Sequence, residues 1–151
     1  MMEWLVDTGI LLRLVNRSDP LHETVVAATR ILHRRGDSFV TTYQNIAEFW
    51  NVSTRPAEAR GGYGRTVRDA SHCVDFFERL GTILPDQPAA YVQWRQLITT
   101  HGVTGVSVHD ARLVALMMVS SISHIFTLDA ADFHRYAHIT AVPPQSVLSQ
   151  L

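Results

Sequence analysis

The most conspicuous absence in this chain of 151 residues is lysine, because all 13 of its basic side chains are arginine. A Walker phosphate loop requires a lysine, so the glycines of "GGYGRT" at 61–66 predict a flexible loop instead. Arginine makes planar, bidentate contacts with phosphate. A coding bias would equally explain the missing lysine, so its absence alone does not indicate nucleic-acid binding.

Cysteine and long apolar runs are also scarce. Cys73 is the only cysteine, which excludes an intrachain disulfide and a thiolate zinc cluster and favours a reducing cytoplasm. No apolar run reaches the roughly 18 residues of a membrane span. The longest, "LVALMMV" at 113–119, predicts a buried helix. The start, "MMEWLVDTG", lacks a basic region, so we expect no signal peptide and no membrane association.

The overall composition is that of a globular protein. The net charge is −1, hydrophobic residues make up 46% and charged residues 18% of the chain. These values exclude a disordered chain, and the near-neutral charge gives no sign of nucleic-acid binding. The length predicts one domain, residues 1–151, with one substantial core.

Strands and helices alternate in the predicted element order. A helix is expected to begin at Pro20 behind an N-capping Asp19 and to end at Gly36, and another to begin at Ser107 with a capping-box-like Ser107–Asp110 pair. The full expectation is strands at 3–7, 38–42, 82–85, 124–128 and 138–142, helices at 8–16, 20–36, 43–52, 67–81, 89–102 and from 107, a loop at 55–65, and an unassigned tail. This order predicts a three-layer α/β/α sandwich with a mostly parallel central sheet.

Acidic residues stand at or just after the ends of predicted strands, or in the helices that follow. They are Asp7, Glu48, Asp110, Asp129 and Asp132. In such folds a ligand site lies beyond the carboxyl ends of the strands, where the strand order reverses. Carboxylates gathered there repel one another unless they take up protons or surround a cation, and oxygen ligands suit Mg²⁺ or Mn²⁺. One such ion or a pair can activate water for phosphodiester hydrolysis.

Each acid also has an ordinary structural interpretation. Asp7 and Asp110 can serve as helix caps, Glu48 can be a solvated helix residue, and Asp129 and Asp132 can cap a short helix. The ordered set favours the metal site over these separate explanations.

Four segments together resemble the PIN-domain nucleases, including the VapC-type toxins of toxin–antitoxin modules. They are "VDTGILLRL", "NIAEFWNVSTRP", "VSVHDARLVALM" and "FTLDAADFHRY", and the resemblance covers nearly the whole chain. It implies an α/β/α fold and a Mg²⁺- or Mn²⁺-dependent ribonuclease, often dimeric, whose metal is gathered by Asp7, Glu48, Asp110 and one or both of Asp129 and Asp132. A toxin of this kind would pair with an antitoxin encoded by a separate gene.

The resemblance has one departure. Gly9 stands where such sequences usually carry Asn or Ser, so a side chain that would orient Asp7 is missing. Thr8, Ser107 and Thr127 are the candidate polar neighbours, although each can equally be a plain cap or strand residue. For substrate binding, the loop and the following helix offer Arg55, Arg60, Arg65 and Arg68, with a solvated surface as the alternative.

Other functions fit less well. "DTG" at 7–9 matches the aspartic-protease triplet, but those proteins are all-β and here a helical pattern follows. Receiver domains rely on a strand-end lysine, which is absent. Ser107, His109 and Asp110 are too close in sequence for a catalytic triad. The remaining rival keeps the fold but is a catalytically silent RNA-binding or scaffold protein.

Overall fold

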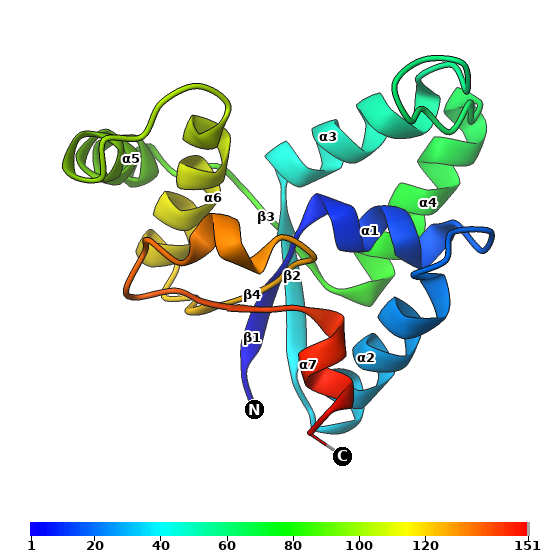
Figure 1. The fold of residues 1–151 in the computed structure, drawn as a ribbon, viewed down its shortest axis with the longest axis horizontal. Coiled ribbons are helices and arrows are strands. Elements are labelled where there is room, and N and C mark those ends of the chain that lie inside the picture. The colour runs from blue at the N-terminus through cyan, green and yellow to red at the C-terminus, as the bar shows by residue number, and fades with distance from the viewer. Residues whose placement is uncertain (151) are drawn as a thin grey trace.

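The computed structural model describes residues 1–150 and shows a central sheet between two layers of helices (Figure 1). The elements run β1 (Glu3–Val6), α1 (Thr8–Val15), α2 (His22–Arg34), β2 (Ser38–Thr42), α3 (Tyr43–Thr54), α4 (Val67–Leu80), β3 (Thr82–Leu84), α5 (Pro88–Thr100), α6 (Ser107–Val119), β4 (His124–Phe126), the 3₁₀ helix η1 (Ala130–Phe133), β5 (Thr140–Val142) and α7 (Pro144–Leu148). The predicted α/β sandwich is therefore confirmed.

All five strands are parallel, in the order β3-β2-β1-β4-β5. Leu5 in the central strand β1 lies beside Val40 of β2 and Ile125 of β4. The chain moves from β1 toward one edge through β2 and toward the other through β4 and β5. The strand order consequently reverses between β1 and β4, and a crevice is expected at the carboxyl ends of these two strands.

Alternation along the strands divides the core into two layers. Trp4 and Val6 of β1 pack into one cluster with residues of α1, α2 and α3, whereas Leu5 packs on the other face against α5 and α6. A parallel sheet covered on both faces needs apolar side chains in both directions, which explains the continuous apolar strands.

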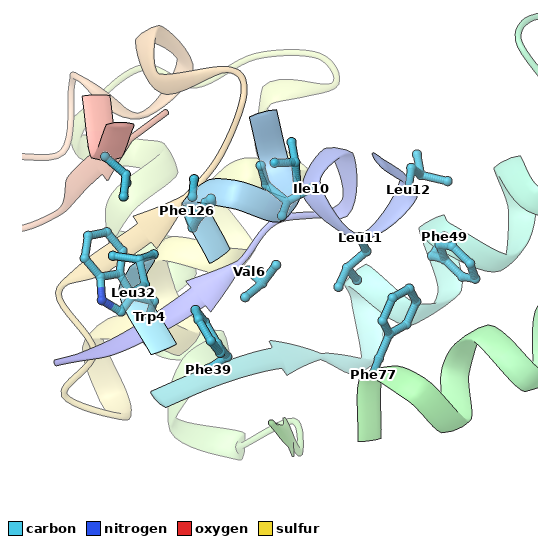
Figure 2. Close-up of a cluster of buried hydrophobic side chains, with 13 residues drawn as sticks. Trp4, Val6, Ile10, Leu11, Leu12, Leu32, Phe39, Phe49, Phe77 and Phe126 are labelled. Atoms are coloured by element: carbon cyan, nitrogen blue, oxygen red, sulfur yellow. The ribbon is translucent and has the colours of Figure 1, made fainter. Parts of the chain in front are cut away.

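Aromatic rings fix α3 and α4 to the first layer. Figure 2 shows Phe49 of α3 and Phe77 of α4 next to Leu11 of α1. The two rings meet edge to face, with centroids 4.8 Å apart and an interplanar angle of 88°. Both are almost fully buried. This contact holds the start of α3 over the carboxyl edge of the sheet, where the acids are found.

One predicted helix start and one predicted helix cap are wrong. Helix α2 begins at His22 and not at Pro20, because the Asp19 carboxylate accepts a hydrogen bond from the backbone N–H of Leu21 (2.8 Å) and thereby closes a turn before the helix. Helix α6 does begin at Ser107, but it has no side-chain cap, so the Ser107–Asp110 capping box is absent.

The predicted end of α2 at Gly36 is confirmed, whereas the tail, for which no element was predicted, contains a helix. Gly36 follows α2 with φ +86°, the left-handed conformation expected of a glycine that ends a helix. The tail contains a further helix, α7, whose Val147 is buried in the first layer. Within residues 1–150 no helix is both long enough and apolar enough to cross a membrane.

Candidate active site

Asp7 lies at the point where the strand order reverses. Its backbone N–H donates to the carbonyl of Phe126 at the end of β4 (3.0 Å). One carboxylate oxygen, Oδ1, accepts from the N–H of Thr8 (2.8 Å) and caps α1, as the ordinary interpretation proposed. The other, Oδ2, accepts from the hydroxyl of Thr127 (2.7 Å). Asp7 therefore caps its helix and also joins the ends of β1 and β4.

Glu48 is held by two side chains at the start of α1 and α3. The hydroxyl of Thr8 donates to Oε2 of Glu48 (2.6 Å), and the amide of Gln44 donates to Oε1 (3.0 Å). Gln44 and Glu48 are four residues apart on one helix and so share a face. Asn45 completes the network by donating to Thr8 Oγ1 (3.0 Å) and, at 3.5 Å, to Asp7 Oδ1. Glu48 is thus not a freely solvated helix residue.

Helix α3 begins at this edge because Thr42, the last residue of β2, caps it. The Thr42 hydroxyl accepts from the backbone N–H of Asn45 (3.1 Å) and donates to the Asn45 side-chain oxygen (2.7 Å). Gln44 also donates to the carbonyl of His109 in α6 (3.0 Å). These contacts connect α3 with the helix that carries Asp110.

The other four acids all lie within electrostatic reach of Asp110. Burial, followed by the charges of Asp7, Asp132, Glu48 and Asp129, raises the pKa of Asp110 to about 6. Burial also raises the pKa of Asp7, against the lowering effect of its hydrogen bonds from Thr127 and Thr8, while Glu48 and Asp129 raise it further. Carboxylates that perturb one another in this way stand within electrostatic reach.

Within residues 1–150, no arginine forms an ion pair with any of the five acids. The one ion pair within 4.0 Å in this part of the chain joins Arg13 to Asp19. The carboxyl edge therefore carries a concentrated negative charge without an ion-pair partner, which is what a cation-binding site requires.

The donor chemistry fits Mg²⁺ or Mn²⁺, since the acids supply only hard oxygen ligands. The side chains do not converge on one point, however, and among the described residues no three His, Cys, Asp or Glu groups stand close enough to hold an ion. Thr8, Thr127, Asn45 and Gln44 occupy the carboxylate oxygens of Asp7 and Glu48 instead.

The predicted polar neighbours divide into two groups. Thr8 and Thr127 contact the acids directly, whereas Ser107 makes no hydrogen bond to any of the five carboxylates within residues 1–150. Sequence reasoning missed Gln44 and Asn45. The available signal was the spacing of four between Gln44 and Glu48, which places them on one helical face.

The departure at Gly9 is compensated. Asp7 receives hydrogen bonds from Thr8, Thr127 and Asn45, so it is oriented without a side chain at position 9. A Cβ at Gly9 would lie 3.5 Å from Leu128 Cδ1, an ordinary contact.

The four candidate RNA-binding arginines lie around the loop at the far end of α3 from the carboxyl edge (Figure 1). Arg65 donates to the carbonyl of Val15 (2.7 Å) and holds this loop to the end of α1, while Arg55 donates to the carbonyl of Arg60 (3.0 Å). Arg60 and Arg68 are exposed. Two of the four thus have partners within the fold.

Comparison with family models identifies the family, and comparison with solved structures identifies the fold. The family model for the PIN domain matches residues 4–139. Among solved structures, a chain of VapBC2 from Rickettsia felis, bound to a promoter DNA fragment, superimposes with a TM-score of 0.66 at 12% identity, covering 94% of this chain and 98% of that one.

Two further structures have the same fold. VapC20 of Mycobacterium tuberculosis, a sarcin-ricin loop cleaving toxin, gives a TM-score of 0.62 at 18% identity, covering 87% of this chain and 94% of that one. A chain of FitAB bound to the IR36 DNA fragment gives 0.60 at 21% identity, covering 95% of each chain. No curated protein sequence is significantly similar to the chain.

Proposed function

Because the chain belongs to the PIN domain family, we propose that it is a Mg²⁺- or Mn²⁺-dependent endoribonuclease and the toxin of a toxin–antitoxin module. The observation that carries the proposal is the group of five carboxylates at the carboxyl edge, where four of them raise the pKa of the fifth, Asp110, and none forms an ion pair within residues 1–150. A catalytically silent relative would have no need of every acid.

Asp7, Glu48, Asp110 and one or both of Asp129 and Asp132 would hold the metal. When bound, Mg²⁺ or Mn²⁺ would polarise the phosphodiester and lower the pKa of an attacking water. Thr127 and Thr8 orient the carboxylates of Asp7 and Glu48, and Asn45 fixes the hydroxyl of Thr8. Asp110, with a pKa of about 6, would lose its remaining proton on cation binding, so affinity should rise with pH through that value.

The partners follow from the family and its solved relatives. The structures of VapBC2 and FitAB are named as toxin–antitoxin pairs. By analogy, we propose that this chain also has an antitoxin partner. The chain is expected to act in the cytoplasm on RNA as a homodimer. Exposed apolar residues such as Tyr43 and Val67 offer surface for such a contact, and light scattering at micromolar concentration would measure the dimer.

The exposed arginines of the α3–α4 loop region remain candidates for RNA phosphates. Replacing both Arg60 and Arg68 by Gln should reduce the dependence of log K on log salt by about 1.4, because each phosphate contact on single strands contributes about 0.7. Arg55 and Arg65 would contribute less, since their guanidinium groups already have carbonyl partners. An unchanged slope would assign Arg60 and Arg68 to the solvated surface.

The decisive experiment measures cleavage of labelled single-stranded RNA by the purified protein with Mg²⁺, with Mn²⁺ and with a chelator. We expect cleavage with either metal, none with the chelator, and at least about a 100-fold loss in Asp7→Asn. Asp75→Asn, an exposed acid on α4, is the matched control and should cleave normally. Chelator-resistant cleavage that survives Asp7→Asn would remove the metal site, and RNA binding without any cleavage would favour the silent alternative.

A further inference from the structure

We call the five carboxylates of Asp7, Glu48, Asp110, Asp129 and Asp132 the acidic group. A cavity of about 290 Å³ lies directly beside it, between the start of α3 and helices α5 and α6. Gln44 lines it and also donates to Glu48 and to the His109 carbonyl, so one residue borders both the cavity and the acids. The volume is at the lower limit of small-ligand pockets. A polymer that binds with one unit in this cavity could place the neighbouring unit next to the carboxylates.

Aromatic rings form one wall of the cavity. Tyr91 and Trp94 of α5 both line it, with ring centroids 6.2 Å apart and an interplanar angle of 39°. The Trp94 indole N–H donates to the carbonyl of Val108 (2.9 Å), which fixes that ring. Tyr91 is 59% exposed and therefore keeps a face open to solvent. Unpaired bases bind to proteins by stacking on such rings.

Only some of the polar side chains that line the cavity have hydrogen-bond partners in the protein. The amide of Gln87 donates to Ser120 (2.8 Å), and the hydroxyl of Tyr91 accepts from Arg95 (3.3 Å). Asp86 and Arg112 also line the cavity, but within residues 1–150 neither side chain makes a hydrogen bond or an ion pair. One acceptor-only carboxylate and one cation are thus free to meet a ligand.

We propose that this cavity binds an unpaired nucleobase of the RNA next to the cleaved bond, with a preference for guanine. The carboxylate of Asp86 accepts from guanine N1–H and its exocyclic amino group, a pair of adjacent donors that adenine, cytosine and uracil do not present. The base stacks on Tyr91 and Trp94, and Arg112 binds the adjoining phosphate. This assignment rests on the proposed function and adds base selection to it.

Binding of single nucleotides tests the cavity separately from cleavage. In the full chain carrying Asp7→Asn, with chelator present, the NMR signal of the Trp94 indole N–H should shift with guanosine monophosphate at lower concentration than with the other three monophosphates. Asp86→Asn should remove the guanine preference. Tyr91→Ala should weaken all four nucleotides about five-fold or more, the lower end of a stacking contribution. Val92→Ala, with 58% exposure on α5 but outside the cavity lining, is the matched control and should change nothing.

Cleavage provides the second measurement. The wild-type protein should cut an oligouridine that contains one guanosine beside that guanosine, and Asp86→Asn should lose this position dependence while still cutting. Metal-dependent cleavage that ignores the guanosine, or a Trp94 signal unmoved by millimolar nucleotide, would overturn the cavity proposal and leave the nuclease intact. Absence of cleavage together with guanine binding would overturn the nuclease alone. If Tyr91→Ala converts a dimer to a monomer, a second copy covers the cavity and the proposal is wrong.

Discussion

The acidic group has two halves that are built differently. Asp7 and Glu48, on the β1 and α3 side, each receive hydrogen bonds from side chains that other contacts hold in place. Asp110, Asp129 and Asp132, on the α6 and β4 side, receive no side-chain hydrogen bond from any residue between 1 and 150, and the last two are exposed. One half is fixed by the fold, and the other is restrained only by its backbone.

Within residues 1–150, Thr127 is the one side chain that hydrogen-bonds with residues of both halves. Its hydroxyl donates to Asp7 Oδ2 (2.7 Å) and accepts from the backbone N–H of Asp129 (3.1 Å), and its side chain is fully buried. In the proposed metal site, the fixed half would hold a position for the cation before it binds, whereas the acids of the other half would have to move toward it. This difference predicts that the hydrogen bonds to Asp7 and Glu48 control the affinity for the cation. The other three acids are expected chiefly to add electrostatic repulsion when no cation is bound.

Among the residues that support the acids, the largest effect is expected at Thr127. Thr127→Val keeps the shape but leaves Asp7 Oδ2 and the Asp129 N–H unpaired, so cleavage and Mn²⁺ affinity should fall about 10- to 100-fold, with a stability loss of about 1–3 kcal/mol. Thr127→Ser, which retains the hydroxyl, should keep most of the activity. Calorimetry measures the Mn²⁺ affinity, and single-turnover kinetics measure the rate of cleavage.

A matched threonine separates this effect from instability. Thr41 is buried in β2 and donates to the carbonyl of Val6 (3.3 Å) without touching a carboxylate. Thr41→Val should also lose stability but should cleave RNA normally. If both valine variants lose activity in proportion to their stability, Thr127 has no special role in joining the two halves.

A smaller effect, of distinctive sign, is expected at Asp110. Its pKa is about 6 in the fold against 3.8 for an unperturbed Asp, so the folded state binds more protons between these values. The stabilising contribution of the protonated group is complete below pH 3.8 and is lost as the pH rises through 6. Because Asp110 is half-exposed, we expect a loss of about 1 kcal/mol after solvent screening.

Asp110→Asn should therefore melt about 2–4 °C higher than wild type at pH 7 without metal, and this advantage should vanish near pH 4. With Mn²⁺ the wild type should gain stability by mass action and the variant much less. Asp69→Asn in the first turn of α4 is the control and should melt lower, since it loses only a favourable charge at a helix N-terminus. An Asp110→Asn variant that melts lower in the same way would show that Asp110 is an ordinary helix residue.

The fold could be predicted from the sequence where the apolar pattern of a strand or helix extends over many residues. The sheet, its parallel strands and most helices follow from apolar alternation, which the two-sided core requires. Helix α7 was missed because five residues after Pro143 are too few to show a helical period. The start of α2 was misplaced because an Asp before a proline caps a turn as readily as a helix, and only tertiary contacts decide between them.

In the candidate site, the acids could be predicted but their supports only in part. Asp7 and Asp110 stand at a strand end and in the first turn of a helix, positions that the pattern of elements reveals, and Glu48 lies inside the helix that follows β2. Gln44 and Asn45 are polar residues in the first turn of a helix, and nothing local shows that this turn meets α1 and α6. The spacing of four reveals only the contact of Gln44 with Glu48, whereas the contacts with α1 and α6 arise from the packing of three elements.

The smallest effect is expected at Gly9, where the fixed half lacks the side chain common in the family. Glycine within a helix is less favourable than alanine by up to about 1 kcal/mol, and near the start of α1 we expect about half of that. The added Cβ would lie 3.5 Å from Leu128 Cδ1 and 3.7 Å from Arg13 Nη1, so it fits without displacement. Gly9→Ala should raise the melting temperature by about 1–2 °C and leave cleavage unchanged.

Two further variants decide whether the fixed half is already complete. Gly62→Ala is the steric control and should destabilise, because its Cβ would collide with the carbonyl oxygens of Arg55 and Pro56. Gly9→Ser restores a hydroxyl near Asp7 and should change cleavage by no more than about twofold, far below the 10- to 100-fold effect of removing a needed supporting contact. A tenfold gain with Ser but not with Ala would mean that Thr127, Thr8 and Asn45 orient Asp7 incompletely. The two halves would then differ less than their hydrogen bonds indicate.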